Sequence, residues 1–345
     1  MRAAVITAPE TMVLDDVPEP AEPAAGELLV APDAVGLCGS DYHFFDGTLS
    51  PAAGGGTFPR ILGHEFGGVI EAVGPGVDAR FETGRRVAIH PLMSCGECYP
   101  CRTGRTNRCA TFTLIGIHVD GGLQERLVVP ASQAFPIDVP TARLAALAEP
   151  VSIAVRAVVR ARVADGEQVV VLGAGPIGQS VALAALDRGA HVLVIDPLDS
   201  RLEIARSLGA QTLQWTTAGE VAAFVADWSD GLGPPVVIDA TGAAEAIEAG
   251  VDMVALTGRV AVVGMSGAQL GLRVGTFAEK EFDMLGVACC NDDEFGVAVD
   301  LVQRHGAALD ALITHEFGLD EAPEAIAFAI ANPAQVMKVM VRNSG

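Results

Sequence analysis

Four cysteines lie close together in the sequence and have the spacing of a metal site. They follow the pattern Cys95-x2-Cys98-x2-Cys101-x7-Cys109. Four thiolates at short spacing can bind one Zn²⁺ tetrahedrally and leave no open position for water, which is typical of a structural zinc site. The alternative is four buried or disulfide-paired cysteines. The tight spacing, in a chain with an odd total of seven cysteines, favours the metal.

A second set of candidate metal ligands is spread along the chain. It comprises Cys38, His64 with Glu65, and Glu149. Thiolate, imidazole and carboxylate are the ligand types of catalytic zinc, which keeps one position open for water or substrate. Each residue also has a structural interpretation: a packed thiol, a buried histidine, or an acid at the start of a helix. The set therefore indicates a metal only if the fold brings its members together.

The third candidate site is a glycine-rich turn between two short apolar stretches. Residues 169–172 form an unbroken apolar run, and 173–178 read Gly-Ala-Gly-Pro-Ile-Gly. A helical pattern follows, and a second apolar run over 191–195 ends at Asp196. The order strand, glycines, helix, strand and acid is typical of a dinucleotide-binding site.

Each part of this turn has a physical reason. Gly173 lets the chain turn out of the strand, Gly175 lets the backbone approach a pyrophosphate, and Gly178 lets helix and strand pack closely. The helix N-terminus offers unpaired N–H groups to the phosphates. Asp196 can accept hydrogen bonds from both ribose hydroxyls, and its carboxylate repels the 2′-phosphate of NADP. We therefore expect NAD as the cofactor.

Two kinds of domain are needed to position these residues. Residues 1–150 are rich in glycine and proline and contain many short apolar runs, which predicts a barrel-like β domain. Residues 151–285 alternate strands and helices, which predicts a doubly wound parallel sheet and hence an α/β protein. After that the chain returns to mixed character.

The expected elements can be given by residue ranges. In the first domain we expect strands at 3–6, 28–30, 67–73, 86–89 and 123–129, and a flexible loop at 52–56. In the second we expect helices at 177–186 and 200–208 and strands at 169–172, 191–195, 236–238, 260–263 and 284–288. Beyond it we expect helices near 295–304 and 322–331 and a strand at 338–341.

Composition and charge exclude several classes of protein. The net charge of −21 argues against a nucleic-acid partner, because binding to nucleic acid depends on cations that neutralise phosphates. No apolar run reaches the roughly 18 residues of a membrane helix. The N-terminal residues contain no signal-peptide core. We therefore expect a cytoplasmic protein with a small-molecule substrate and neither a membrane nor a nucleic-acid partner.

Together the motifs resemble the zinc-dependent medium-chain dehydrogenase/reductase superfamily. The matching motifs are Gly-His-Glu at 63–65, the four-cysteine lobe, and Gly-Ala-Gly-Pro-Ile-Gly at 173–178. Val-Gly-Pro-Gly-Val at 73–77 and Gly-Arg-Arg-Val at 84–87 are also at familiar places. The resemblance covers essentially the whole chain.

This resemblance implies a fold and a branch of the superfamily. The fold is a GroES-like catalytic domain with a structural-zinc lobe over 1–150, completed by 286–345, and a Rossmann NAD-binding domain over 151–285. Ethanol-type alcohol dehydrogenases have a further cysteine ligand where this chain has Glu149. With His-x-Asp-Gly-Gly at 118–122, the chain looks most like the polyol branch of sorbitol, threonine and galactonate-type dehydrogenases.

The resemblance also implies the ligands of two zinc ions per chain. Cys38 and His64 bind the catalytic zinc directly. Glu65 and Glu149 supply carboxylate ligation, one of them through water or only transiently. The structural zinc is bound by the four clustered cysteines.

Further roles follow from the same resemblance. Ser40 touches the substrate alcohol, His43 passes its proton to solvent, and Glu65 belongs to the catalytic group as well as to the metal. Asp41 is similar to the carboxylate that orients a ligand histidine.

The resemblance implies a set of cofactor contacts in addition to the three glycines and Asp196. Pro176 and Ile177 surround the pyrophosphate with backbone, although Pro176 has no N–H to donate. Arg201 lies where a side chain covers the adenosine. Lys338 matches a position whose cation often faces the pyrophosphate.

We therefore predict oxidation of a secondary alcohol in a polyol or sugar acid, with hydride transfer to NAD giving a ketose or keto-acid. The first alternative is an L-threonine 3-dehydrogenase type, which an extra acidic residue in the pocket would favour because threonine carries an ammonium group. The second is a protein that binds NAD and zinc without catalysis, which would be expected to lose Cys38, His64 or Ser40.

Two further expectations concern the substrate and the assembly. A sugar acid needs a cation, for which Arg60, Arg102 and Arg108 are the candidates in the sequence. The family resemblance implies a homotetramer or a homodimer, with the apolar strand at 284–288 as a sheet edge that pairs between subunits.

Overall fold

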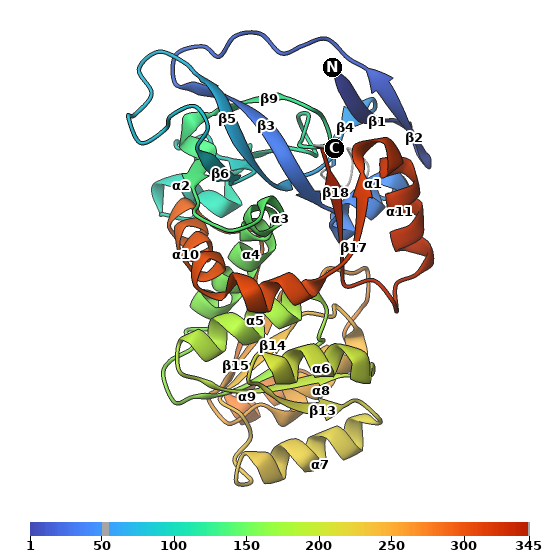
Figure 1. Ribbon diagram of the computed structural model, residues 1–345. Coiled ribbons are helices and arrows are strands. Elements are labelled where there is room, and N and C mark those ends of the chain that lie inside the picture. Colours follow the sequence, from blue (N-terminus) through green and yellow to red (C-terminus); the bar gives the residue numbers. More distant parts are fainter. Residues whose placement is uncertain (50–54, 344–345) are drawn as a thin grey trace. The chain divides into compact units, whose positions relative to one another are not determined.

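The computed structural model describes residues 1–49 and 55–343, and the chain divides into two compact units. Unit 1 comprises Met1–Ser152 and Asn291–Gly345, and unit 2 comprises Ile153–Cys290. Figure 1 labels their helices and strands. No helix among the described residues is long and apolar enough to cross a bilayer.

The predicted division of the chain can be compared with these units. The prediction places 1–150 and 286–345 in one domain and 151–285 in the other, which is close to the observed bounds. The chain passes from unit 1 to unit 2 within helix α4 (Ala148–Arg160). The predicted loop at 52–56 lies largely outside the described residues.

Unit 2 is built on a parallel sheet of six strands in the order β13-β12-β11-β14-β15-β16. The strands are β11 (Gln168–Leu172), β12 (His191–Asp196), β13 (Gln211–Gln214), β14 (Val236–Asp239), β15 (Arg259–Val262) and β16 (Asp283–Gly286). The helices are α5 (Pro176–Asp187), α6 (Asp199–Ser207), α7 (Ala218–Trp228), α8 (Ala244–Met253) and α9 (Val274–Lys280). The strand order reverses between β11 and β14, which is the doubly wound arrangement and confirms the predicted Rossmann fold.

The centre of this sheet explains why its sequence is so apolar. β11 pairs parallel with β12 on one side and β14 on the other, with Val170 opposite both Leu193 and Val237. These three side chains are completely buried in the core of unit 2. A strand covered on both faces needs apolar residues at successive positions rather than alternate ones. The apolar run at 169–172 therefore fits its place as the central strand of the sheet.

The described residues of unit 1 form a sheet of seven strands, a sheet of three and a sheet of two. Its strands are β1 (Arg2–Ala8), β2 (Thr11–Asp16), β3 (Glu27–Gly36), β4 (Arg60–Ile61), β5 (Glu65–Val73), β6 (Arg86–Ile89), β7 (Leu92–Met93), β8 (Thr113–Leu114), β9 (Leu127–Pro130), β10 (Ala134–Pro136), β17 (Ile313–Gly318) and β18 (Lys338–Arg342). Its helices are α1 (Gly39–Phe45), α2 (Tyr99–Arg102), α3 (Ala142–Ala146), α10 (Asp292–Leu309) and α11 (Ala322–Ala331). Short 3-10 turns are η2 (Thr106–Arg108), η3 (Ala131–Gln133), η4 (Asp310–Leu312) and η5 (Leu319–Glu321).

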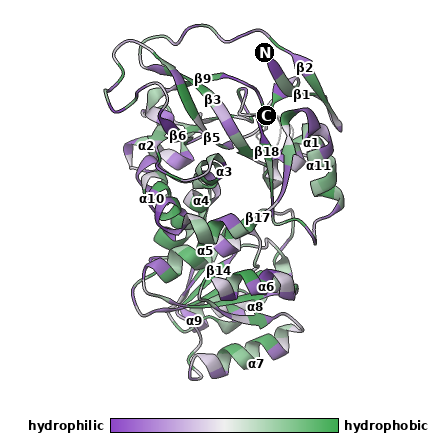
Figure 2. Ribbon diagram, viewed as in Figure 1, coloured by the Kyte–Doolittle hydropathy of each residue, from purple (hydrophilic) through white to green (hydrophobic). Residues whose placement is uncertain are grey.

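β3 organises unit 1 because it pairs with β5, β9 and β18. Along most of the strand, buried residues alternate with partly exposed ones, so one face points into the core of unit 1. Figure 2 accordingly shows apolar and polar residues along the same strands of this unit. The register between β3 and β5 shifts next to Pro32, which has no N–H to donate to a ladder. The strands of unit 1 confirm the predicted GroES-like β domain.

Some predicted elements differ from the observed ones. The predicted strand at 123–129 is regular only in β9, because Gly121 and Gly122 form a turn whose backbone bonds run to residues before β5. The strand expected at 284–288 is β16, one residue earlier at its start and shorter at its end. β13 and β17 are absent from the prediction because their residues are mostly polar and only partly buried.

Candidate active site

Three predicted metal ligands lie at the ends of neighbouring strands in unit 1. Cys38 caps the N-terminus of α1 just beyond β3, His64 directly precedes β5, and Glu65 begins it. β3 and β5 pair antiparallel with Gly36 opposite Glu65, so the end of one strand meets the start of the other. One ligand atom from each of Cys38, His64 and Glu65 lies within 4.8 Å of the others. The fold thus brings together a thiol, an imidazole and a carboxylate.

His64 is oriented by a buried acid. Asp41 is completely buried, its Oδ2 accepts the N–H of Cys38 at 2.8 Å, and its Oδ1 lies 3.4 Å from Nδ1 of His64. Burial alone would lower the pKa of His64, but the carboxylate of Asp41 raises it well above its ordinary value. An acid at Nδ1 leaves Nε2 as the nitrogen available to a metal, which would displace the proton there. Asp41 therefore lies where the sequence predicted.

Glu65 is held by a lysine from the last strand of the chain. Nζ of Lys338 lies 2.7 and 2.6 Å from the two carboxylate oxygens of Glu65 and 3.1 Å from the carbonyl oxygen of Leu37. Both charged side chains are almost completely buried. Burial alone would lower the pKa of Lys338, but the carboxylate of Glu65 raises it above its ordinary value.

The structure gives Lys338 partners in unit 1, and its contact with the cofactor stays a prediction. The sequence led us to expect a cation that faces the pyrophosphate of the cofactor. The ammonium group has three donors, and in the structure all three have oxygen acceptors in unit 1. Lys338 is therefore a partner of the ligand cluster and not a free cation.

Glu149 lies beside the ligand cluster and not in it. Among the described residues, the group around Cys38 that could hold a metal includes His64 and Glu65 but not Glu149. Glu149 is in the first turn of α4, near enough to His64 and Glu65 for their charges to act on it. Burial raises its pKa to about 7. The resemblance implied that one of Glu65 and Glu149 is bound through water or only transiently, and that role of Glu149 stays a prediction.

Ser40 and His43 lie on α1 beside the cluster. Oγ of Ser40 lies 3.2 Å from Nε2 of His64, the nitrogen that faces the metal position. His43 is exposed, with Nδ1 3.2 Å from Oγ1 of Thr48 and 3.8 Å from Oδ2 of Asp46. No direct hydrogen bond joins Ser40 to His43 within the described part of the chain. Ser40 therefore contacts the cluster, whereas His43 contacts solvent.

Of the three arginines proposed as a carboxylate-binding cation, Arg60 and Arg102 have partners in the structure. Nη1 of Arg60 lies 3.0 Å from Oδ1 of Asp120. Arg102 donates to the carbonyl oxygen of Glu97, and Arg108 lies in η2, both within the four-cysteine lobe. The assignment of one of these arginines to a substrate carboxylate stays a prediction.

The four-cysteine lobe brings its four sulfur atoms close enough together to bind one metal ion. One Sγ from each of its cysteines lies within 4.8 Å of all the others, and Sγ of Cys98 lies 3.4 Å from that of Cys101. Zinc–sulfur bonds of about 2.3 Å in a tetrahedron separate the sulfurs by about 3.8 Å, whereas a disulfide requires about 2.0 Å. All four cysteines are free. The spacing therefore fits a metal and not disulfides.

Backbone N–H groups support thiolates in this lobe. Cys95 N–H points to Sγ of Cys109 at 3.3 Å, and the N–H groups of Ala110 and Thr111 point to Sγ of Cys98 and Cys109 at 3.4 Å. The N–H groups at the turn after Cys95 lower the pKa of its thiol to about 6. Zinc binds the thiolate form, which these N–H groups favour at Cys95, whereas burial raises the pKa of the Cys101 thiol to about 12.

The glycine-rich turn of unit 2 shows three different constraints. Gly173 has a φ of +93°, and a Cβ there would lie 2.7 Å from the side chain of Thr241. A Cβ at Gly178 would lie 1.9 Å from the carbonyl oxygen of Gly173, whereas a Cβ at Gly175 would meet nothing within 4 Å. Gly175 caps α5, which begins with Pro176 and Ile177. The open side at Gly175 is therefore where a pyrophosphate can approach the helix N-terminus.

Asp196 fixes this turn before any cofactor binds. Its Oδ2 accepts the N–H of Ala174 at 2.7 Å, its Oδ1 accepts the N–H of Leu198 at 2.8 Å, and it is 4% exposed. Each carboxylate oxygen has a second lone pair, so a ribose hydroxyl can share the acid with the turn. Asp196 thus has both a structural and a potential cofactor-binding role.

The sequence analysis missed Gln179, which joins the turn to α6. Its side chain is completely buried, and Nε2 donates to the carbonyl oxygens of Ala174 at 3.1 Å and Arg201 at 2.7 Å. The signal was a glutamine in a helix whose following residues are small or apolar. Buried polar side chains need partners, so this position pointed to a local polar contact.

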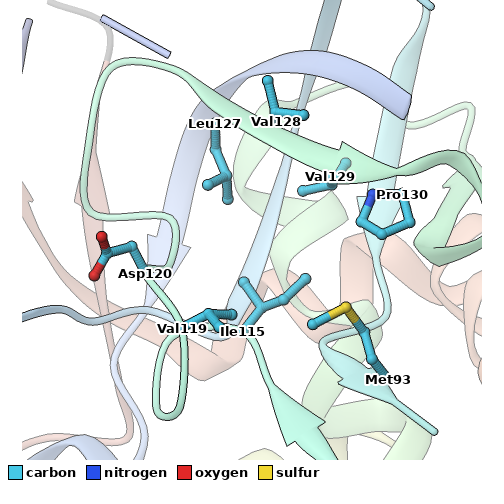
Figure 3. Close-up of a pocket in the computed structure, with 8 residues that line it drawn as sticks. All are labelled: Met93, Ile115, Val119, Asp120, Leu127, Val128, Val129 and Pro130. Carbon is cyan, nitrogen blue, oxygen red and sulfur yellow. The ribbon is translucent and has the colours of Figure 1, made fainter. Parts of the chain in front are cut away.

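A small apolar cavity of about 170 Å³ in unit 1 is drawn in Figure 3. Its lining residues are Met93, Ile115, Val119, Asp120, Leu127, Val128, Val129 and Pro130. None of them is a predicted metal, catalytic or cofactor residue, so this cavity gives no support to the predicted site.

Known proteins share both units and most of their length with this chain. The family model Alcohol dehydrogenase GroES-like domain matches residues 24–139, and Zinc-binding dehydrogenase matches 176–304. L-Galactonate-5-dehydrogenase of Escherichia coli (strain K12) is 33% identical over 320 residues, 92% of each chain. L-Threonine 3-dehydrogenase of Pyrococcus abyssi is 33% identical over 322 residues, 90% of this chain and 89% of the other.

Two solved structures of dehydrogenases are also similar to this chain over nearly its whole length. A short chain alcohol dehydrogenase from E. coli CFT073, complexed with NADH, is 30% identical with a TM-score of 0.86. A zinc-binding dehydrogenase from Sinorhizobium meliloti 1021, bound to NADP, is 30% identical with a TM-score of 0.89. Each comparison covers 99% of both chains.

The chain belongs to the zinc-dependent medium-chain dehydrogenase/reductase superfamily, in the branch of polyol, threonine and sugar-acid dehydrogenases. It is an oxidoreductase that acts on a CH–OH group with a nicotinamide cofactor.

The glycine turn gives a paired prediction. Gly178→Ala should lower the free energy of unfolding by about 1–3 kcal/mol, the usual cost of overpacking, because its Cβ meets a backbone oxygen. Gly175→Ala should leave stability within about 0.5 kcal/mol but weaken NADH binding, because its Cβ enters the space for the pyrophosphate. Calorimetry and NADH fluorescence titration measure the two effects. Equal effects on stability would contradict the assignment.

Proposed function

We propose that the protein oxidises a secondary hydroxyl of a polyol or sugar acid at a zinc ion bound by Cys38 and His64, with NAD as the hydride acceptor. The observation that supports it is the convergence of Cys38, His64 and Glu65 within 4.8 Å, with Ser40 beside His64. The donor set, one thiol, one imidazole and one carboxylate, is that of a catalytic zinc site.

We propose a separate role in the reaction for each residue around the cluster. A zinc ion bound there supplies Lewis-acid chemistry that lowers the pKa of the substrate hydroxyl. Asp41 keeps the ring of His64 in place with Nε2 toward the metal position. Ser40, whose Oγ lies 3.2 Å from that nitrogen, is placed to take the hydroxyl proton. His43, on the same helix and exposed, is the proposed exit for that proton to solvent.

Glu65 and Glu149 are proposed as secondary ligands. Both carboxylate oxygens of Glu65 accept from Lys338, so a metal would share this carboxylate with the ammonium group. Glu149 lies outside the cluster, where a water molecule is the natural bridge to a metal. We therefore propose Cys38 and His64 as constant ligands, Glu65 as a transient one and Glu149 as a ligand through water.

We propose two zinc ions per chain, the second in the four-cysteine lobe. The support is the closeness of the four sulfur atoms and the backbone N–H groups that point at them. The four thiols also point to a reducing compartment, and we propose the cytoplasm.

The preference for NAD over NADP rests on Asp196. Its carboxylate is fixed at the end of β12 by two backbone N–H groups. Asp196→Asn removes the charge and keeps one acceptor. The kcat/KM ratio of NAD to NADP should fall by about fivefold or more, as expected for roughly 1 kcal/mol between charges about 4 Å apart in water.

The control for this variant is Asp199→Asn, an exposed acid in the first turn of α6 that pairs with Arg206. It should leave the ratio unchanged. A wild-type protein with higher kcat/KM for NADP would show that the cofactor assignment is wrong.

A second candidate function is supported by Glu149. This acid is held beside the cluster, and unit 1 places Asp41, Glu65 and Glu149 near one another with Lys338 as their neighbouring cation. An acidic surrounding suits a substrate that carries an ammonium group, such as L-threonine, better than it suits a substrate whose only charge is a carboxylate. L-Threonine 3-dehydrogenase activity is therefore the alternative.

Initial rates with NAD across polyols, aldonates, L-threonine and simple primary alcohols separate these functions. We expect the best polyol or sugar acid to exceed ethanol by at least about a hundredfold in kcat/KM, because unpaired polar groups disfavour an alcohol that lacks hydroxyls. Cys38→Ser should abolish turnover without lowering the melting temperature substantially. Comparable values for ethanol and the best polyol, or normal activity in Cys38→Ser, would refute the proposal.

Glu149→Gln distinguishes the two candidates. If L-threonine is the substrate, loss of the charge should raise its KM strongly. If a polyol is the substrate, the variant should bind it nearly as well as the wild type.

We propose a homotetramer or homodimer, and β16 supports it. Among the described residues, this strand is the last of the parallel sheet, and an edge strand can pair with the same strand of a second subunit. Light scattering at micromolar concentration should give a multiple of the 35.5 kDa chain mass. A monomer would overturn this proposal.

A further inference from the structure

A buried asparagine near the C-terminus is bonded to a turn close to the ligand cluster. Nδ2 of Asn343 donates to the carbonyl oxygens of Gly122 at 2.6 Å and Gln124 at 2.7 Å. Its backbone N–H donates to the carbonyl oxygen of Asp33 at 3.1 Å, and the residue is 8% exposed. It follows β18, which pairs with β3 and is drawn in red in Figure 1. Both amide N–H groups of Asn343 therefore fix the turn at 121–124.

This turn is hydrogen-bonded to the three residues before His64. Backbone N–H groups of residues 121, 122 and 123 donate to the carbonyl oxygens of Ile61, Gly63 and Leu62, at 2.8, 2.8 and 3.0 Å. The two backbone segments pack tightly, because a Cβ at Gly121 would lie 2.4 Å from the carbonyl oxygen of Gly63. A shift of the turn must therefore shift the backbone that leads into His64.

We infer that Asn343 is a positioning residue for the metal site: through the turn at 121–124 it sets where His64 stands relative to Cys38. The inference goes beyond the proposed function and rests on it, because it presumes a metal at Cys38 and His64. With this role for Asn343, strand β18 and the residue that follows it would affect the cluster at two points. Lys338 holds Glu65 and the carbonyl next to Cys38 directly, and Asn343 holds the segment before His64 through the turn at 121–124.

The opposing interpretation is that Asn343 only stabilises the fold. Two hydrogen bonds from a buried amide contribute to stability wherever they lie. A purely structural role would lower the melting temperature and leave the metal environment as it is. A positioning role changes the metal environment itself, which a spectroscopic measurement detects.

The test is Asn343→Leu, which keeps a side chain of similar size and removes both donors. The matched control is Asn332→Leu, since Asn332 also donates from Nδ2 to a backbone carbonyl, that of Phe328 at 2.9 Å, at the end of α11. We measure zinc loss to a chelator and the absorption of cobalt-substituted protein. The bands of the Cys38 site are those that disappear in Cys38→Ser.

We expect Asn343→Leu to lose zinc from the Cys38 site about tenfold faster, within the range seen when outer-shell partners of a metal are removed. Its cobalt bands for that site should shift or broaden. Zinc in the four-cysteine lobe should leave at the wild-type rate, and Asn332→Leu should match the wild type at both sites. Asn343→Ser, which keeps one donor, should be intermediate and serves as the test if the leucine variant does not fold.

Two results would overturn the inference and are distinguishable. If Asn343→Leu and Asn343→Ser retain wild-type zinc loss and cobalt bands while melting earlier, Asn343 is only structural and the proposed function stands. If the wild type and Cys38→Ser bind the same amount of metal, no metal is held at Cys38, and both the proposed function and this inference are wrong.

Discussion

The buried ion pair between Glu65 and Lys338 is the interaction on which the candidate active site depends. Burial of two charges is unfavourable unless they neutralise each other and their remaining groups are bonded, and loss of one partner costs about 3–5 kcal/mol. Here all three ammonium donors have acceptors, including the carbonyl of Leu37 next to Cys38. The pair therefore ties the C-terminal strand to two predicted ligands, so unit 1 must contain both ends of the chain.

Much of this architecture could be predicted from the sequence because local patterns specify it. The apolar run at 169–172 with the following glycines specified the centre of the parallel sheet, since only a strand covered on both faces tolerates such a run. The four cysteines could be predicted to lie together because the spacing between them in the sequence is short. Cys38 and His64 were identified through resemblance, and the antiparallel pairing of β3 and β5 supplies the physical reason for their meeting.

What the sequence did not predict depends on contacts between distant residues. The pairing of Lys338 with Glu65 was not predicted, because nothing local indicates that an acid so far away in the sequence neutralises it. Glu149 was assigned to the metal, but the direction of α4 sets where its carboxylate lies. Asn343 and Gln179 have no motif at all, and only the paths of the neighbouring backbone show what their amides hold. The sequence therefore did not predict the partners of polar side chains that act through tertiary contacts.

The central claim is that the fold assembles a metal centre from Cys38, His64 and the Glu65–Lys338 pair, separate from the four-cysteine lobe. An anomalous difference map from crystals of the freshly purified protein, recorded at the zinc absorption edge, tests it most directly. The account predicts two peaks per chain, one within the four sulfurs and one between Sγ of Cys38 and Nε2 of His64. A single peak in the lobe, with Cys38 and His64 free of metal, would contradict it.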